Sequence, residues 1–268
     1  MAEISVAPET LFMIGPLAVT NSLIGTWLAM LFLIVLALIV RRNLSIVPGR
    51  LQALLEWPIE GMLNLVTGVD RQRGIRYFPL VMAMFLFILT MNWMGLLPGF
   101  GTIGFLEEKE GHQVLVPFLR AGTADLSTTI ALALVSFVVF IGFGVVVHGP
   151  VGYLKTFANP PALAPLEILQ HLFRAVSLSL RLFGNVFAGE AIQIVFLSFL
   201  GPAAFVIPAI FILLELLFGL VQAGIFALLT MTYILLATLE HGPSHGPAHE
   251  RGEGAGDHDS GVLSPASS

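Results

Sequence analysis

Five ionisable residues interrupt two long apolar segments near the C-terminal end of this 268-residue sequence. They are Glu167, Arg174, Arg181 and Glu190 in segment 165–200, and Glu215 in segment 203–239. A charged side chain at the centre of a bilayer costs roughly 2.5–3.5 kcal/mol on insertion scales. Charged residues inside such segments usually mark a path for ions, so these five are the first candidates for chemistry.

The first segment carries a polar stripe if it is a helix turning 100° per residue. Its members recur every three or four positions: Glu167, Gln170 or His171, Arg174, Ser177, Arg181 and Asn185. This spacing predicts a face that is wet or that lies against a polar partner. The stripe ends near Asn185, and Glu190 lies about half a turn from Arg181 around the axis.

The second segment has a polar face of its own, with positions four and three residues apart: Glu215, Gly219 and Gln222. If the chain folds back at Gly201-Pro202, the pair Arg181 and Gln222 and the pair Glu190 and Glu215 are each spaced almost equally on the two sides of this turn. The sequence therefore predicts an antiparallel helical hairpin, in which Arg181 faces Gln222 and Glu190 faces Glu215.

These residue types suit the movement of protons. Two carboxylates close together in a low dielectric cannot both ionise easily, which favours a relay of protons between them. Arginine stays charged at any physiological pH, so it blocks free protons and attracts a carboxylate. Asp125, at the outer mouth of a third apolar segment, either joins the outer path or caps the helix that follows it.

Several of these residues also have a purely structural interpretation. Arg181 can extend to a lipid headgroup with its aliphatic stem buried. Glu190 and Glu215 can form a structural bond across the helix pair, and Glu167 can be an interfacial acid at a helix start. The Ser177 hydroxyl can bond back to its own helix.

The composition indicates a polytopic membrane protein. Hydrophobic residues make up 56% of the chain and charged residues 11%, with a mean hydropathy of +0.91, against roughly 25% charged residues in soluble domains. Cysteine is absent, which excludes disulfides, thiolate metal sites and cysteine nucleophiles. The N-terminus has neither the basic region of a signal peptide nor the pattern of a transit peptide, so we expect the first apolar run to stay in the mature protein.

We expect an all-α fold of about four spanning or re-entrant helices plus a long, strongly tilted C-terminal helical hairpin. Expected spans are 21–40, 78–97 and 126–147; segment 43–76 is predicted to be an amphipathic helix that is surface-lying or re-entrant, and 99–124 and 149–164 are predicted to be connecting loops.

Three regions are expected: an extracytoplasmic lead-in (1–20), a membrane domain (21–241) and a disordered cytoplasmic tail (242–268). The tail is rich in glycine and histidine, and we expect its histidines to be incidental rather than metal ligands. The basic 41–76 segment predicts a cytoplasmic side, and the acidic 99–124 segment predicts the opposite side, which puts the N-terminus outside.

Four stretches resemble subunit a of F-type ATP synthases over about residues 20–241. The most specific is LSLRLFGNVFAGE at 178–190, and the others are LTMNWMGLLPG at 89–99, GTADLSTTIALAL at 122–134 and QAGIFALLTMTYIL at 222–235. The resemblance implies a proton-conducting stator subunit without catalytic chemistry, cofactor or metal. Its implied partners are the c-ring, subunit b, the rest of the F1F0 complex and lipid, but no nucleic acid. The implied location is a bacterial inner membrane.

The resemblance also assigns roles by position. Arg181 matches the arginine that faces the c-ring carboxylates, and Gln222 matches the glutamine beside it. Glu190 matches the acid of the outer half-channel, with Glu215 as its partner, where other members carry histidine or other groups. The remaining matches are outer-channel positions Asn185 and Asp125, and positions near the cytoplasmic half-channel, Glu167, Arg174 and Ser177.

Two other classes of function can be set against this one. A self-contained channel or secondary transporter is disfavoured, because the sequence has no internal repeat and no matching pair of broken helices. An intramembrane protease would need a nucleophile elbow or an H-E-x-x-H pair, and neither is present.

Overall fold

Helices dominate the structure, a computed structural model that describes residues 9–15, 17–42, 44–46, 48–97, 100–101, 103–109, 112–157, 164–200 and 206–238. The α-helices are α1 (Asn21–Arg42), α2 (Arg50–Val69), α3 (Arg71–Met94), α4 (Leu126–His148), α5 (Pro150–Phe157), α6 (Ala164–Leu200) and α7 (Val206–Thr238). The predicted all-α membrane fold is confirmed, and the boundaries of α1, α4, α6 and α7 agree with the predicted segments within three residues.

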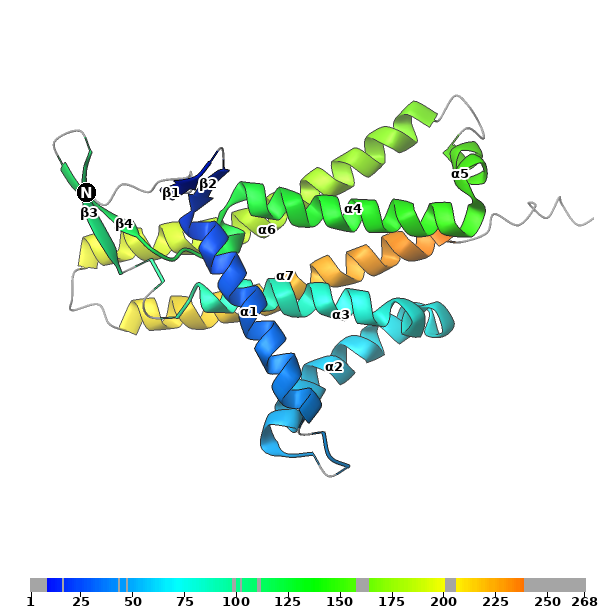
Figure 1. Ribbon diagram of the computed structural model, residues 1–268, viewed down its shortest axis with the longest axis horizontal. Helices are drawn as coiled ribbons and strands as arrows, with labels where there is room; N and C mark the ends of the chain where they lie inside the picture. The colour runs from blue at the N-terminus through cyan, green and yellow to red at the C-terminus, as the bar shows by residue number, and fades with distance from the viewer. Residues whose placement is uncertain are drawn as a thin grey trace, which may run out of the picture.

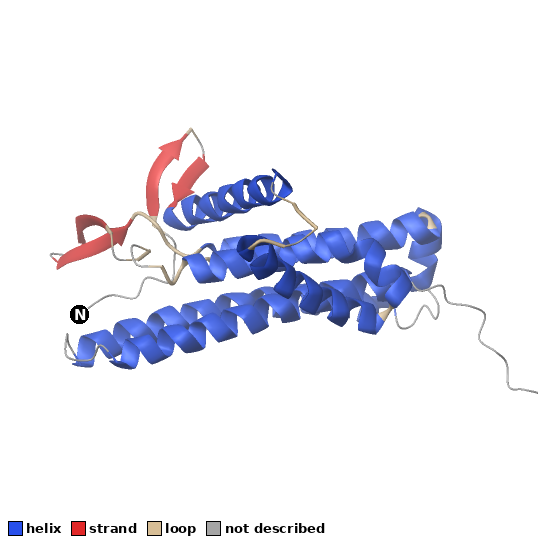
Figure 2. Cartoon of the chain, turned by 90° about the horizontal axis from the view of Figure 1, so that it is seen from below, coloured by secondary structure: helices blue, strands red, loops and turns tan. Residues whose placement is uncertain are grey.

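Four helices, α3, α4, α6 and α7, run together along the long axis of the molecule, and α1 crosses in front of them at a steep angle (Figure 1). Within this bundle α7 packs against α3, α4 and α6, and α4 also packs against α6. The view turned by 90° shows the same alignment of the long helices (Figure 2). The bundle therefore holds the α6–α7 pair from the side of α3 and α4.

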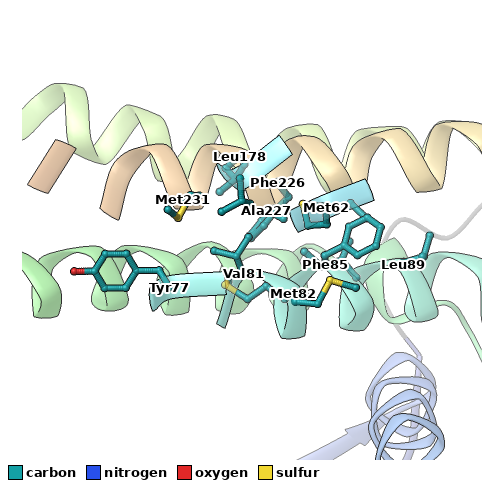
Figure 3. Close-up of a cluster of buried hydrophobic side chains, with 14 of the residues drawn as sticks. Met62, Tyr77, Val81, Met82, Phe85, Leu89, Leu178, Phe226, Ala227 and Met231 are labelled. Atoms are coloured by element: carbon teal, nitrogen blue, oxygen red, sulfur yellow. The ribbon is translucent and has the colours of Figure 1, made fainter. Parts of the chain in front are cut away.

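The core forms where α3 and α7 meet, because both helices place bulky apolar residues at helical spacing on one face. The α3 face presents Tyr77, Val81, Phe85, Ile88 and Met91, and the α7 face presents Phe226, Ala227, Met231 and Ile234, all buried. Met62 and Val66 of α2 and Leu178 of α6 join the same cluster (Figure 3). Close packing of this kind is a main source of association between helices in lipid, so this contact fixes α7 in place.

Helix α1 is buried only where its first turns meet the rest of the chain. Asn21, Ser22, Gly25 and Ala29 are buried, whereas apolar side chains from Trp27 to Ile39 are exposed on several sides. A helix that is apolar on all sides is typical of a membrane span. Within the residues that the structure describes, four helical segments are long and apolar enough to cross a membrane: Asn21–Arg42, Arg71–Met94, Leu126–His148 and Ala209–Thr238.

Helix α3 begins earlier than predicted. The sequence placed the start of this span after the last arginine, at Phe78, but the structure starts the helix at Arg71. The reason is a helix cap, because the Asp70 side chain accepts a hydrogen bond from the backbone N–H of Arg73 at 3.0 Å. Arg71, Arg73 and Arg76 therefore occupy the first turns of α3, and segment 43–76 is divided at Asp70.

Two segments predicted as irregular contain regular structure. In 99–124, β3 (Gly104–Lys109) pairs antiparallel with β4 (His112–Pro117), and a short 3-10 helix, η1 (Gly122–Ala124), follows. In the connector 149–164 the structure forms α5, which starts at Pro150, a residue suited to the first helical position. The lead-in also folds locally, as β1 (Thr10–Ile14) pairs with β2 (Leu17–Thr20). The predicted tail, 242–268, lies outside the described residues.

The contact between α1 and the chain before η1 gives a testable prediction. A β-carbon at Gly25 would lie 2.3 Å from the Arg120 carbonyl oxygen, so Gly25→Ala must force the backbones apart. Overpacking of this kind costs about 1–3 kcal/mol, and we expect a lower unfolding temperature for the purified protein in detergent. The matched control is Gly142→Ala in α4, where a β-carbon meets nothing within 4 Å and alanine favours the helix. Equal unfolding temperatures for the two variants would contradict the close approach.

Candidate functional site

Helices α6 and α7 form the predicted antiparallel pair. Near the Leu200 end of α6, a β-carbon on Gly189 would lie 2.6 Å from Glu215 Oε1, and the rings of Phe196 and Phe211 are 4.9 Å apart. Towards the other end of the pair, the Arg174 guanidinium lies over the Tyr233 ring at 5.2 Å. The hinge predicted at Gly201-Pro202 lies outside the described residues.

The structure brings Glu190 and Glu215 together, as the shared register predicted. Glu215 lies against Gly189, the residue before Glu190 on α6, but each carboxylate has a partner of its own. Arg120 donates from Nη2 and Nε to Glu190 Oε2, at 3.1 and 3.3 Å. Gln193 donates from Nε2 to Glu215 Oε2. We call these four residues the carboxylate cluster.

Arg120 and Gln193 were not among the predicted site residues. Arg120 lies between β4 and η1, outside the apolar segments where charged residues attract attention. Gln193 is uncharged and lies three residues beyond Glu190, beyond the end of the predicted polar stripe. Two features of the sequence could have indicated these residues. Arg120 lies five residues before Asp125, and the i, i+3 spacing puts Gln193 near Glu190 on the helix face.

Asp125 acts as a helix cap. Its Oδ1 accepts from the backbone N–H of Ser127 at 2.8 Å, and its Oδ2 accepts from the Ser22 hydroxyl at 2.8 Å. The residue is buried and thus ties the start of α4 to the start of α1. The structure therefore shows the cap, and the predicted place of Asp125 in the outer path stays a prediction.

The polar stripe of α6 lines an open groove of about 460 Å³. The lining residues are Gln170, Phe173, Arg174, Ser177, Leu178 and Arg181 from α6, with Leu229 and Tyr233 from α7. Arg181 is exposed in this groove. Glu167 lies near the start of α6, but its side chain is outside the described part of the structure.

Gln222, which the predicted register places opposite Arg181, is buried in the bundle and is not among the residues that line the groove. Its Nε2 has no hydrogen-bond partner, and no hydrogen bond joins it to Arg181 in the described part of the chain. One turn away on α7, the Gly219 carbonyl accepts from Asn92 Nδ2 at 3.2 Å, and a β-carbon at Gly219 would lie 3.2 Å from the Asn92 Cβ. Asn92 of α3 therefore packs against this part of α7.

The carboxylate cluster and the groove both involve α6, and contacts with η1 and α4 hold this helix in place. Val186 packs against Ala121 and Ala124 around η1, with half-buried Asn185 beside it. The Ser179 hydroxyl donates to Thr129 of α4 at 3.2 Å, and Ser136 of α4 bonds Thr230 of α7 at 2.8 Å. Among the described residues, no group of three His, Asp or Glu side chains is arranged to hold a metal ion.

Comparison with known proteins identifies the family. The family model described as "ATP synthase A chain" matches residues 23–235. The chain belongs to the ATP synthase A chain family. Together with the four apolar helices, this membership makes it a multi-pass membrane protein.

Three curated relatives, each named ATP synthase subunit a, illustrate the breadth of the family match. The protein of Moorella thermoacetica is 35% identical over 238 residues, which cover 88% of this chain and 98% of the relative. The protein of Geobacter sp. (strain M21) is 38% identical over a match that covers 82% of this chain and 88% of the relative. That of Nitratidesulfovibrio vulgaris (strain DP4) is 39% identical and covers 81% and 84%.

The hydroxyl contact between α4 and α7 can be tested by cross-linking. In Ser136→Cys/Thr230→Cys, we expect oxidation to form a disulfide, because the two hydroxyls lie 2.8 Å apart and the side chains point toward one another across the helix pair. The readout is the loss of two alkylatable thiols by mass spectrometry, and the natural chain contributes none because it lacks cysteine. The control pair is Ser136→Cys/Thr232→Cys, whose second residue points about 200° away around α7. Equal cross-linking in both pairs would contradict the packing.

Proposed function

We propose that this chain is the ion-translocating stator subunit of an F-type ATP synthase and that the ion is the proton. The chain conducts protons past a rotating ring of c subunits and makes or breaks no covalent bond of a substrate. Support comes from the family match over residues 23–235 and from relatives named ATP synthase subunit a.

One observation carries the proposal: an exposed arginine lies on a long apolar helix with separate polar groups on either side of it. Gln170, Arg174 and Ser177 line the groove on one side of Arg181, and the carboxylate cluster lies on the other. About 20 Å of helix separates Ser177 from Glu190 at 1.5 Å per residue. We assign the groove to the cytoplasmic half-channel, together with Glu167, and the carboxylate cluster to the outer half-channel, together with Asn185 and Asp125.

In this scheme Arg181 is the barrier between the two half-channels. It cannot hand on a proton, because its guanidinium stays protonated at any physiological pH. Its charge attracts an ionised carboxylate of the passing ring and repels a free proton. A proton must therefore cross on the ring, having entered by one half-channel and leaving by the other. The same scheme assigns Gln222, which is buried in α7, to this region on the basis of the predicted register.

The surface beside Arg181 fits a partner inside the membrane. On α6 the exposed side chains around the arginine are large and apolar, among them Phe173, Val176 and Leu180. An apolar surface that surrounds one exposed cation suits a helical ring whose outer face is apolar apart from one carboxylate per subunit. We therefore assign the c-ring to this face, and propose that subunit b and the rest of the F1F0 complex contact other surfaces.

The helix lengths bear on the orientation in the membrane. Helix α1, with 22 residues, measures about 33 Å and matches a hydrocarbon layer of roughly 30 Å when upright. The bundle crosses α1 at a steep angle (Figure 1), so an upright α1 implies a strong inclination of α6 and α7. We propose a bacterial inner membrane, with the N-terminus outside and the Arg41–Arg42 end of α1 in the cytoplasm.

The test compares Arg181→Ala with the natural sequence in the whole complex, reconstituted in sealed vesicles. We expect gradient-driven ATP synthesis to be lost and the passive proton leak to rise, because the barrier between the half-channels has been removed. The control is Arg71→Gln, which removes an exposed cation near the start of α3 and should change neither quantity. Retained synthesis with an unchanged leak would leave Arg181 as a residue that reaches for a lipid headgroup, and would overturn the proposal.

A further inference from the structure

Arg120 is held in a fixed position against the carboxylate cluster. Its side chain is 11% exposed, and two of its nitrogens converge on one oxygen of Glu190. The contact spans 70 positions of sequence and joins the segment between β4 and η1 to α6. The Glu190 side chain is 28% exposed, so the pair is partly buried and differs from a fully exposed salt bridge, whose contribution is about 0–1 kcal/mol.

The backbone around Arg120 is packed on two sides. Its carbonyl oxygen lies against Gly25 of α1, and the β-carbon of Ala121 lies 2.6 Å from where Gly95 would carry one. Ala121 and Ala124 also pack against Val186, one turn before Glu190 on α6. This packing fixes the backbone of Arg120 close to α6, and the two hydrogen bonds to Glu190 then orient its guanidinium.

The charges in the cluster are unequal. The charged groups of the described residues that lie together here are Arg120 from the segment between β4 and η1, Glu190 from α6 and Glu215 from α7. Gln193 is neutral, and Asp125 is engaged with Ser22 and the N–H of Ser127. With both carboxylates ionised the cluster carries one net negative charge, and a single proton makes it neutral.

The hydrogen bonds indicate which carboxylate takes that proton. Oε2 of Glu190 accepts two charge-assisted bonds from Arg120, an arrangement that favours the ionised form. Glu215 accepts from the neutral Gln193 amide through Oε2, and its Oε1 lies against the helix backbone at Gly189. Only Glu215 therefore combines proximity to a fixed anion with the lack of a cationic partner.

We propose that Arg120 is a positioning residue that holds Glu190 as a permanent anion, and thereby makes Glu215 the carboxyl group that carries the transported proton in the outer half-channel. This inference rests on the proposed function. In each passage Glu215 gains one proton from water on the outer side and releases it toward the ring. Only one O–H bond forms and breaks, and Arg120 and Glu190 keep their charges throughout.

The test is a double-mutant cycle that neutralises the charges of Arg120 and Glu190 singly and together, in the whole complex reconstituted in vesicles. ATP synthesis is measured against the pH of the compartment that corresponds to the outside, at constant electrical potential. Loss of the Arg120 cation leaves two carboxylates to share a proton, so Arg120→Gln should shift the profile to higher pH by about one unit. Glu190→Gln leaves Arg120 beside Glu215, so the profile should shift to lower pH.

The double variant Arg120→Gln/Glu190→Gln removes both charges, and its profile should return toward that of the natural protein. Arg120→Lys keeps the positive charge, so its profile should lie close to that of the natural protein and show little of the shift caused by Arg120→Gln. Glu215→Gln should abolish synthesis in the natural sequence, in Glu190→Gln and in the double variant, because Glu190 is either paired with Arg120 or absent in each of these. The matched control is Arg42→Gln, which removes an exposed cation at the far end of α1 and should leave the profile in place.

Each contrary outcome has a distinct meaning. If Glu190→Gln is inactive and the double variant is equally inactive, Glu190 carries the proton itself and the inference is wrong. If Arg120→Gln fails to assemble, the double variant and Arg120→Lys carry the test, and a failure of both to assemble reduces Arg120 to a structural contact. Synthesis retained in Glu215→Gln but lost in Arg181→Ala overturns this inference alone, whereas synthesis retained in both overturns the proposed function.

Discussion

The free-energy cost of charged side chains in an apolar layer governs how α6 and α7 are built. Each charge on α6 for which the structure describes a side chain has a way to reduce that cost. Glu190 pairs with Arg120, Arg174 lies over the Tyr233 ring, and Arg181 opens into a groove. On α7, Glu215 accepts from Gln193. An unpaired charge buried in a low dielectric would cost several kcal/mol, so these contacts are what allows the two helices to carry ion-conducting groups at all.

The same constraint explains how the bundle is held together. Helices in lipid gain little from apolar contact with one another, because the surrounding chains are equally apolar. Association then depends on close packing and on hydrogen bonds between helices. The hydroxyl pairs Ser136–Thr230 and Ser179–Thr129, and the Asn92 bond to the α7 backbone, supply such bonds from α3 and α4. These hydrogen bonds hold α6 and α7, the helices that bear the charges, against α3 and α4. The structural polar groups therefore lie in the same part of the bundle as the functional ones.

Much of this arrangement can be predicted from the sequence, because charges in apolar segments are rare enough to be informative. The register of α6 on α7 follows from the positions of Glu190 and Glu215, and the stripe through Arg174, Ser177 and Arg181 follows from helical periodicity. The predicted start of α3 was wrong, because it was inferred from the position of the last charged residue, whereas the Asp70 cap determines where the helix begins.

Arg120 could not be found by the same reasoning. An arginine in a polar connecting segment is unremarkable by composition, and its importance comes from a contact across 70 positions that only the folded chain reveals. The Gln222 side chain illustrates the opposite limit. Helical spacing placed it correctly on the inner face of α7, but spacing does not determine rotamers, and the structure gives its Nε2 no partner. Helix periodicity therefore predicts which face a residue occupies, and long-range packing decides which atoms meet.

The inclination of α6 and α7 links their length to the offset of the two polar regions. Helices of 37 and 33 residues measure about 55 and 50 Å, well beyond a hydrocarbon layer of roughly 30 Å. If the pair stood upright, the groove and the carboxylate cluster would lie above one another, with only Arg181 between them. When the pair is inclined, the same spacing along α6 displaces them sideways, so a proton that enters beside one cannot leave beside the other without being carried laterally. Helix length, the steep crossing by α1 and the separation of the two polar regions are thus consequences of one geometry, in which a straight path is replaced by a path that needs rotation.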